Sequence, residues 1–155
     1  MNKIFLSHPH SAARTAIKFA RWIGKSFGDQ IEVICTSEPE HHIDRGHMVT
    51  TGIVEHIKSS TVVLALITPE SLKLPWIFYE MGASHALGKV FIPCVGRGLT
   101  LRDLPPQAYE YQGAELTSEE GLHRIIDVLS RYIEIRPAAL VDYHEVAQEF
   151  DLPNA

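Results

Sequence analysis

The sequence predicts a doubly wound α/β fold, in which helices cover both faces of a mainly parallel, five-stranded sheet. Short β-favouring apolar runs alternate with segments whose apolar residues recur at helical spacing, the pattern of parallel α/β proteins. The run TVVLALIT at 61–68 is apolar without alternation, as expected for a central parallel strand covered on both faces. The 155 residues suffice for one domain with a full core, without disulfides or metals.

The first strand is predicted over KIFLS at 3–7, where His8 and Pro9 stop it. Ser11 is placed to cap the helix that follows, and Gly28 is placed to close it. The apolar residues of this helix recur on one face, and they are Ala16, Phe19, Ala20, Ile23 and Phe27. We expect that face to pack on the sheet.

A second strand is predicted over IEVICT at 31–36 and is followed by a polar loop at 37–48. The next helix presents four apolar residues on one face, namely Val49, Ile53, Val54 and Ile57. This helix leads into the central strand at 61–68, so the order strand, helix, strand repeats.

A further helix is predicted to begin at Pro75 and to end at Gly88, and KVFIPCV at 89–95 is the fourth strand. The loop after it is predicted to hold one short edge strand around 109–111.

The last long helix follows Thr117, a plausible N-cap residue. Its predicted buried face consists of Leu122, Ile125, Ile126, Leu129 and Ile133. We therefore expect a domain over 1–136. A tail over 137–155 is expected to form a short helix at 142–150 or to act as a linker.

Composition excludes several classes of protein. The net charge of −5 and a pI near 6.0 argue against non-specific nucleic-acid binding, which needs a basic surface. Cys35 and Cys94 each end an apolar run, so both are expected to be buried free thiols. No apolar stretch reaches the length of a membrane span, and the first strand begins at Lys3, so a cytoplasmic protein is expected.

The segment PWIFYEMGASHALGKVFIPCV at 75–95 holds one carboxylate, Glu80, in an apolar and nearly uncharged run. In a helix, residues three, four and seven apart share a face, so the spacing puts Trp76, Glu80, Ala83 and Leu87 on one stripe. Glu80 then either pairs with a basic residue or hydroxyl inside the fold, or lies in a cleft with a shifted pKa. The pattern alone leaves both open.

Ligands of doubly wound folds bind beyond the carboxyl ends of the strands. That rule points to Ser7 and His8, to the loop at 37–48, and to the loop that leads into Pro75. His8 is predicted either to touch substrate or to cap the next helix. In the glycine-flanked turn at 96–98, Arg97 is a candidate phosphate contact, although a plain turn is favoured.

No metal site is predicted. The 37–48 loop is rich in histidine, with His41, His42 and His47, but their spacing fits no common metal site. A solvated loop is the favoured interpretation.

Three pieces of the chain together resemble the TIR (Toll/interleukin-1 receptor) domain family, in its prokaryotic NAD-cleaving form. IFLSH resembles the first-strand signature of that family. HHIDRGHMVTTGIVEHIKSSTVVLALITPESL at 41–72 resembles its loop glycine, second helix and third strand. Trp76-Ile-Phe-Tyr-Glu80 matches the W-x-x-x-E motif of the enzymatic members. The likeness runs from about residue 3 to residue 134.

The resemblance implies a flavodoxin-like fold and cleavage of NAD+, as substrate and not as cofactor, at the nicotinamide–ribose bond. By position, Glu80 matches the catalytic glutamate, Trp76 matches the motif tryptophan, and Ser7 and His8 match residues that border the pocket. The loop at 37–48, including Arg45 as a substrate-binding residue, matches the BB loop that gates the pocket and takes part in self-association.

The resemblance also implies a role in bacterial antiviral defence or signalling, with self-association and a sensor protein or fused sensor domain as partners. The reaction passes through an oxocarbenium-like ribose. One glutamate to stabilise that cation and one tryptophan to position a ring are a sufficient minimum for the protein, and no metal is needed.

Two alternatives remain at this point. The chain can be a non-enzymatic TIR interaction module, in which Trp76 and Glu80 are structural. It can also be an enzyme similar to nucleoside 2-deoxyribosyltransferases, because YEMGASHALGKVFIPCV resembles their E-x-G-x-A…G-K segment.

Overall fold

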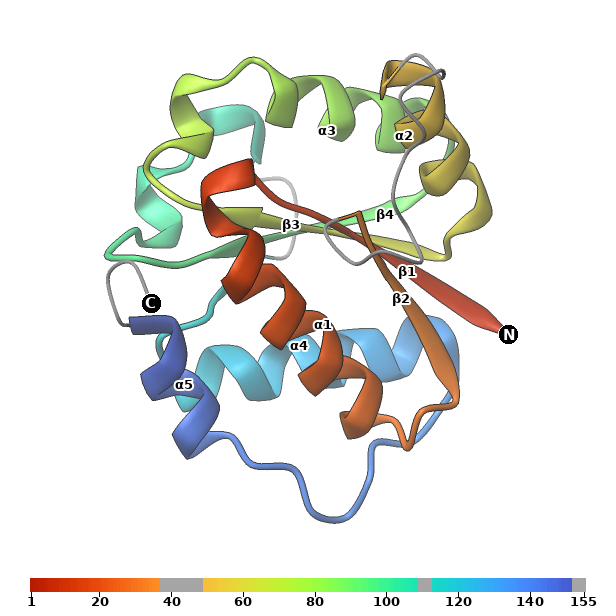
Figure 1. Cartoon of the computed structure of the whole chain (residues 1–155), viewed down its shortest axis with the longest axis vertical. Helices are drawn as coiled ribbons and strands as arrows, with labels where there is room; N and C mark the ends of the chain where they lie inside the picture. Colours follow the sequence, from red (N-terminus) through yellow and green to blue (C-terminus); the bar gives the residue numbers. More distant parts are fainter. Residues whose placement is uncertain (37–48, 109–112, 152–155) are drawn as a thin grey trace.

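Five parallel strands form one sheet in the order β2-β1-β3-β4-β5 (Figure 1). The structure is a computed structural model that describes residues 1–36, 49–108 and 113–151. The strands are β1 (Asn2–Ser7), β2 (Ile31–Cys35), β3 (Val62–Ile67), β4 (Val90–Val95) and β5 (Ala114–Glu115). The expected α/β, flavodoxin-like fold is confirmed, and every strand pair of the sheet is parallel.

Helices cover both faces of this sheet (Figure 1). α1 (Ala13–Ser26), α4 (Glu119–Ile133) and α5 (His144–Asp151) lie on one face, and α2 (Val49–Ser59) and α3 (Trp76–Ala86) lie on the other. Short 3-10 turns occupy η1 (His10–Ala12), η3 (Ser71–Lys73), η4 (Leu101–Asp103) and η5 (Pro106–Ala108). The predicted apolar faces of α1 and α4 are buried against the sheet.

The alternation of side chains along β1 decides what faces α3. Ile4 and Leu6 belong to the core on the α1 and α4 side, whereas Phe5 belongs to the core on the α2 and α3 side. Successive strand residues point to opposite faces, so Ser7 points to the same side as Phe5. The last residue of β1 thus presents a hydroxyl toward the layer that contains Glu80.

Two predicted helix caps are wrong. Ser11 makes no capping hydrogen bond, because a 3-10 turn at η1 precedes α1, and its hydroxyl instead donates to Glu70 Oε2 at 3.1 Å. α4 is capped by Ser118, whose Oγ accepts from the Gly121 N–H at 3.0 Å, and not by Thr117. Thr117 and Ser118 are both good N-cap residue types, so the sequence could not show which of the two caps α4.

The edge strand predicted around 109–111 lies outside the described residues, so it stays a prediction. In the described part of the chain, the edge of the sheet is β5, Ala114–Glu115. Cys35 and Cys94 are buried free thiols, as predicted, and burial raises the pKa of the Cys94 thiol. Within the described ranges, no helix is long and apolar enough to cross a membrane.

The C-terminal segment folds onto the α1 side of the molecule. α5 lies within the predicted tail, and its Phe150 and Ala147 are buried in the same core as α1 and α4. The Trp22 indole N–H donates to the carbonyl of Asp142 at 3.0 Å. The predicted division at residue 136 stays a prediction.

Candidate active site

A small pocket lies at the point where the order of strands in the sheet reverses, between β1 and β3. β1 pairs with β2 on one side and with β3 on the other, so the ends of β1 and β3 form the switch point of this topology. The pocket has a cavity volume of about 20 Å³, and its lining residues are Ser7, His8, Pro9, Leu66, Ser71, Leu74, Trp76 and Ile77. Its position is that of ligand sites in other open α/β sheets.

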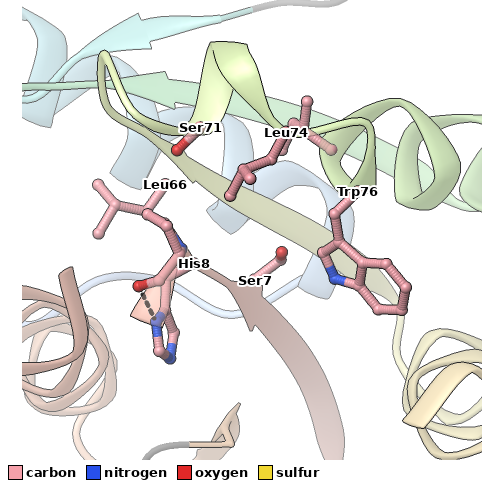
Figure 2. Close-up of a pocket in the computed structure, with 8 residues that line it drawn as sticks. Ser7, His8, Leu66, Ser71, Leu74 and Trp76 are labelled. Atoms are coloured by element: carbon pink, nitrogen blue, oxygen red, sulfur yellow. Dashed lines mark hydrogen bonds between the residues drawn. The ribbon is translucent and has the colours of Figure 1, made fainter. Parts of the chain in front are cut away.

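Side chains from three segments converge on this pocket (Figure 2). Ser7 comes from the end of β1, Ser71 and Leu74 come from the connection after β3, and Trp76 comes from the first turn of α3. The Ser7 hydroxyl and the Trp76 indole face the same space, whereas the His8 ring is turned away from it. Trp76 also stacks on Tyr79, with ring centroids 5.3 Å apart.

Glu80 is buried one helical turn after Trp76. Its side chain is 1% exposed, and neither carboxylate oxygen has a hydrogen-bond partner among the residues that the structure describes. Of the two interpretations that the sequence leaves open, pairing of Glu80 inside the fold is not supported by any hydrogen bond of regular geometry among the described residues. A buried carboxylate without a hydrogen-bond partner among the described residues is costly, which makes Glu80 a candidate site residue.

Burial raises the pKa of Glu80 from 4.5 to about 7. Ser7 and Trp76 lie near enough to lower this pKa and so moderate the rise, yet neither makes a hydrogen bond of regular geometry to the carboxylate. Both residues line the pocket, and Glu80 itself does not. The carboxylate thus lies behind two lining residues, and the side chains must shift before a ligand can reach it.

The predicted stripe on α3 is correct for three of its four members. Trp76 and Ala83 are half-buried and Glu80 is buried, but Leu87 is 37% exposed because it follows the last helical residue. The small residues after Glu80 differ in role. Gly82 faces open space, whereas Ser84 is fully buried and donates to the Glu80 carbonyl at 2.7 Å.

His8 lies at the rim of the pocket. Its Nδ1 is 2.9 Å from the carbonyl oxygen of Pro9, which fixes the proton on that nitrogen in the neutral ring. Burial lowers the pKa of His8, and nearby His10 lowers it further, although the Pro9 carbonyl opposes both. The imidazole is therefore neutral at pH 7.

A polar network beside the pocket was missed by the sequence analysis. Glu70 Oε2 accepts hydrogen bonds from Ser11 Oγ and Thr68 Oγ1, each at 3.1 Å, and lies 3.8 Å from Arg97 Nη1. Ser71 Oγ accepts from the Thr68 N–H at 3.0 Å. The sequence signal was the polar group T-P-E-S at 68–71, directly after the central strand.

The remaining predicted site residues cannot be compared with the structure. Arg45 and the loop histidines at 41, 42 and 47 lie outside the described residues. Within residues 1–36, 49–108 and 113–151, no three His, Cys, Asp or Glu side chains gather as a metal site would require.

Known structures share this fold. A metazoan TIR-STING receptor from C. gigas, solved with 2′,3′-cGAMP, has a TM-score of 0.61 at 20% identity, over 87% of this chain and 40% of that receptor. A CMP N-glycosidase from Clostridium botulinum has a TM-score of 0.50 at 14% identity, over 82% of this chain and 99% of that one. A 2-desoxiribosyltransferase from Leishmania mexicana has a TM-score of 0.48 at 16% identity, over 72% and 71%.

Sequence comparison supplies the family. No curated protein matches the chain, but the family profile described as "TIR domain" matches residues 4–126. This match includes most of β1, all of β2 to β5, the pocket and the W-x-x-x-E segment of α3. The chain belongs to the TIR domain family.

Proposed function

We propose that this chain is an NAD+ glycohydrolase, which cleaves the nicotinamide–ribose bond and releases nicotinamide and ADP-ribose or a cyclic variant. The supporting observation is Glu80, a buried carboxylate without a hydrogen-bond partner in the described residues, behind the pocket at the switch point of the sheet. Membership of the TIR family and the W-x-x-x-E spacing support the same assignment.

The proposed reaction needs little from the protein. The bond between ribose C1′ and the pyridinium nitrogen breaks, and both electrons leave with the nitrogen, so nicotinamide departs neutral without a general acid. The ribose becomes an oxocarbenium-like cation, to which water adds and then gives up a proton. A carboxylate in a dry site stabilises that cation where its charge develops. This is the role we assign to Glu80.

Trp76 and Ser7 are assigned to substrate binding. The indole of Trp76 offers a flat apolar wall for the nicotinamide ring, and the Ser7 hydroxyl can bond the ribose hydroxyls or the carboxylate. Because Glu80 is 1% exposed, we also propose that self-association opens the site, which fits the family expectation. A sensor partner and a role in antiviral defence remain predictions.

The test is nicotinamide release from NAD+ by the purified chain over a series of protein concentrations. Glu80→Gln removes the charge and keeps the volume, so we expect its kcat to fall by about 100-fold or more. Glu55→Gln, which removes an exposed carboxylate from α2, is the matched control and should behave like the wild type. Retention of full activity by Glu80→Gln contradicts the proposal, and so does a fully assembled wild type that releases no nicotinamide.

The two alternatives give different results in the same experiment. A deoxyribosyltransferase-like enzyme would transfer the sugar of a deoxynucleoside and leave NAD+ intact. An interaction module would cleave neither substrate, and its Glu80 would be a structural residue. In that case Glu80→Gln should lose several kcal/mol of stability, as the loss of a buried partner does.

A further inference from the structure

The described pocket has no full positive charge with which to hold a phosphate. Its lining consists of neutral side chains, and the one titratable member, His8, has a lowered pKa and is neutral at pH 7. Its cavity volume of about 20 Å³ is also far below the usual range of ligand sites, about 300–1,000 Å³. If the proposed function holds, the pocket takes the nicotinamide end of NAD+, and the diphosphate must lie outside it along the sheet edge.

Arg97 lies at the carboxyl end of β4, in a turn that is hydrogen-bonded to the end of β3. The Gly96 N–H donates to the carbonyl of Ile67 at 3.0 Å, directly before the Thr68–Ser71 turn. Arg97 itself has a φ of 54°, in the left-handed region that glycine and asparagine favour. Its side chain is only 13% exposed. An arginine held in an unfavourable backbone conformation and partly buried indicates a role beyond a plain turn.

The Arg97 guanidinium is linked to the pocket wall through Glu70. Arg97 Nη1 lies 3.8 Å from Glu70 Oε2, which also accepts from Thr68 Oγ1, and Thr68 in turn bonds Ser71, a lining residue. The ion pair is long and rests on a single contact, and the Glu70 side chain is more than half exposed. Such a pair is weak, so the Arg97 guanidinium can leave Glu70 and bind a stronger anion.

We propose that Arg97 binds the diphosphate of the substrate, with Glu70 holding the guanidinium in place until the substrate arrives. This inference rests on the proposed NAD+ glycohydrolase function. The planar guanidinium donates two parallel N–H groups to phosphate oxygens, a geometry that lysine cannot reproduce. Arg97 is thus a substrate-binding residue that the TIR motifs do not include.

The first measurement is the binding of ADP-ribose to the full chain by calorimetry, which needs no turnover. Arg97→Gly suits the left-handed turn, so this variant should fold at least as stably as the wild type. We expect it to bind ADP-ribose about 10- to 100-fold more weakly, and Arg97→Lys to lie between the two. The matched control is Arg131→Ala, which removes an exposed arginine from α4.

The second measurement compares kcat/KM for NAD+ with that for nicotinamide riboside, which has no phosphate. In Arg97→Gly, kcat/KM for NAD+ divided by kcat/KM for nicotinamide riboside should fall by about 10- to 100-fold, as the ADP-ribose affinity does. An equal loss of kcat/KM on both substrates would overturn the inference, since Arg97 would then only shape the pocket. Unchanged ADP-ribose affinity in Arg97→Gly would also overturn it, and so would a wild type that does not bind ADP-ribose. If ADP-ribose binding depends on Arg97 but NAD+ is not cleaved, the proposed function fails and the phosphate site does not.

Discussion

Among the residues that the structure describes, Glu80 is the one whose buried side-chain oxygens lack a hydrogen-bond partner. Its carboxylate is taken out of water, and no described residue compensates it with a hydrogen bond of regular geometry. Burial therefore makes the charged form expensive and brings the pKa to about 7. A group in this state titrates near neutral pH, which gives both its stability effect and its activity a defined pH dependence.

The stability effect of Glu80 should favour low pH. Its pKa is about 7 in the folded protein and 4.5 when unperturbed, so between these values the folded protein keeps a proton that the unfolded chain has lost. The free energy of unfolding then falls as pH rises from 4.5 to 7. Glutamine does not titrate. Glu80→Gln should therefore match the wild type near pH 4 and exceed it by roughly 3 kcal/mol at pH 8.

Urea unfolding at pH 4, 6 and 8 measures this difference. Glu55→Gln, on the exposed face of α2, should differ from the wild type by the same small amount at every pH. A Glu80→Gln variant that is less stable than the wild type at pH 8 would show that the carboxylate has a partner in the folded protein.

The proposed reaction should be more active at high pH. The carboxylate form of Glu80 stabilises the ribose cation, and it is the minor form below its pKa of about 7. We expect kcat/KM for NAD+ to rise roughly tenfold per unit below pH 7 and to level off above it. A flat profile between pH 5.5 and 8.5 would mean that Glu80 is ionised throughout, and hence that its burial differs in the active assembly.

At the residue scale, the sequence predicted that Trp76, Glu80 and Ser7 lie in one region but not the state of their side chains. Helical spacing places Trp76 and Glu80 on one stripe, and the rule that ligands bind beyond the carboxyl ends of parallel strands points to Ser7. Whether Glu80 has a hydrogen-bond partner depends on packing between separate segments, which spacing does not reveal, and the described residues supply none. The same holds for Glu70, whose contacts with Ser11 and Arg97 join three segments.

Elements were predicted well where their signal is periodic and poorly where it is a single residue. The apolar faces of α1 and α4 recur over several turns, so their burial follows from the pattern. A cap depends on where the chain enters the helix, and the adjacent Thr117 and Ser118 are equally suitable by type. The short β5 has only two residues, too few for a strand pattern.

The start of α4 depends on a glycine for its close approach to β5. A Cβ on Gly121 would overlap the carbonyl oxygen of Glu115, so Gly121→Ala must push the helix away from the sheet. We expect a loss of about 3 kcal/mol in the free energy of unfolding, the upper part of the range for overpacking. The measurement is urea unfolding monitored by circular dichroism.

Gly82→Ala is the matched control for this prediction. Gly82 lies inside α3 with nothing within 4 Å of its would-be Cβ, so alanine should raise the stability by about 0.5–1 kcal/mol through helix propensity. If both substitutions changed the stability by the same amount, the close approach of Gly121 to Glu115 would have no energetic weight.

The whole molecule consists of two unequal apolar layers around one sheet. α2 and α3 lie on one side of the sheet, and α1, α4 and α5 lie on the other (Figure 1). The buried carboxylate of Glu80 belongs to α3, whereas most of the large buried side chains belong to the core on the α1 side. The family match ends at residue 126, so α5 lies beyond it. The sequence predicted a short helix or a linker there, but the packing of α5 on the domain was not predictable, because Phe150 contacts Phe19 of α1, more than a hundred residues away.

α5 should stabilise the whole domain through Phe150. The ring is 3% exposed and meets Phe19 edge to face, with centroids 5.3 Å apart, in a core that Trp22 also borders. Phe150→Ala removes this contact and leaves a cavity, which costs about 3 kcal/mol, while Leu140→Ala, at a side chain 96% exposed in the same segment, should change the stability by less than about 0.5 kcal/mol. Urea unfolding of both variants measures the difference. Equal effects would mean that α5 is a detachable tail, and a large loss only for Phe150→Ala would make residues 137–151 part of the folding unit.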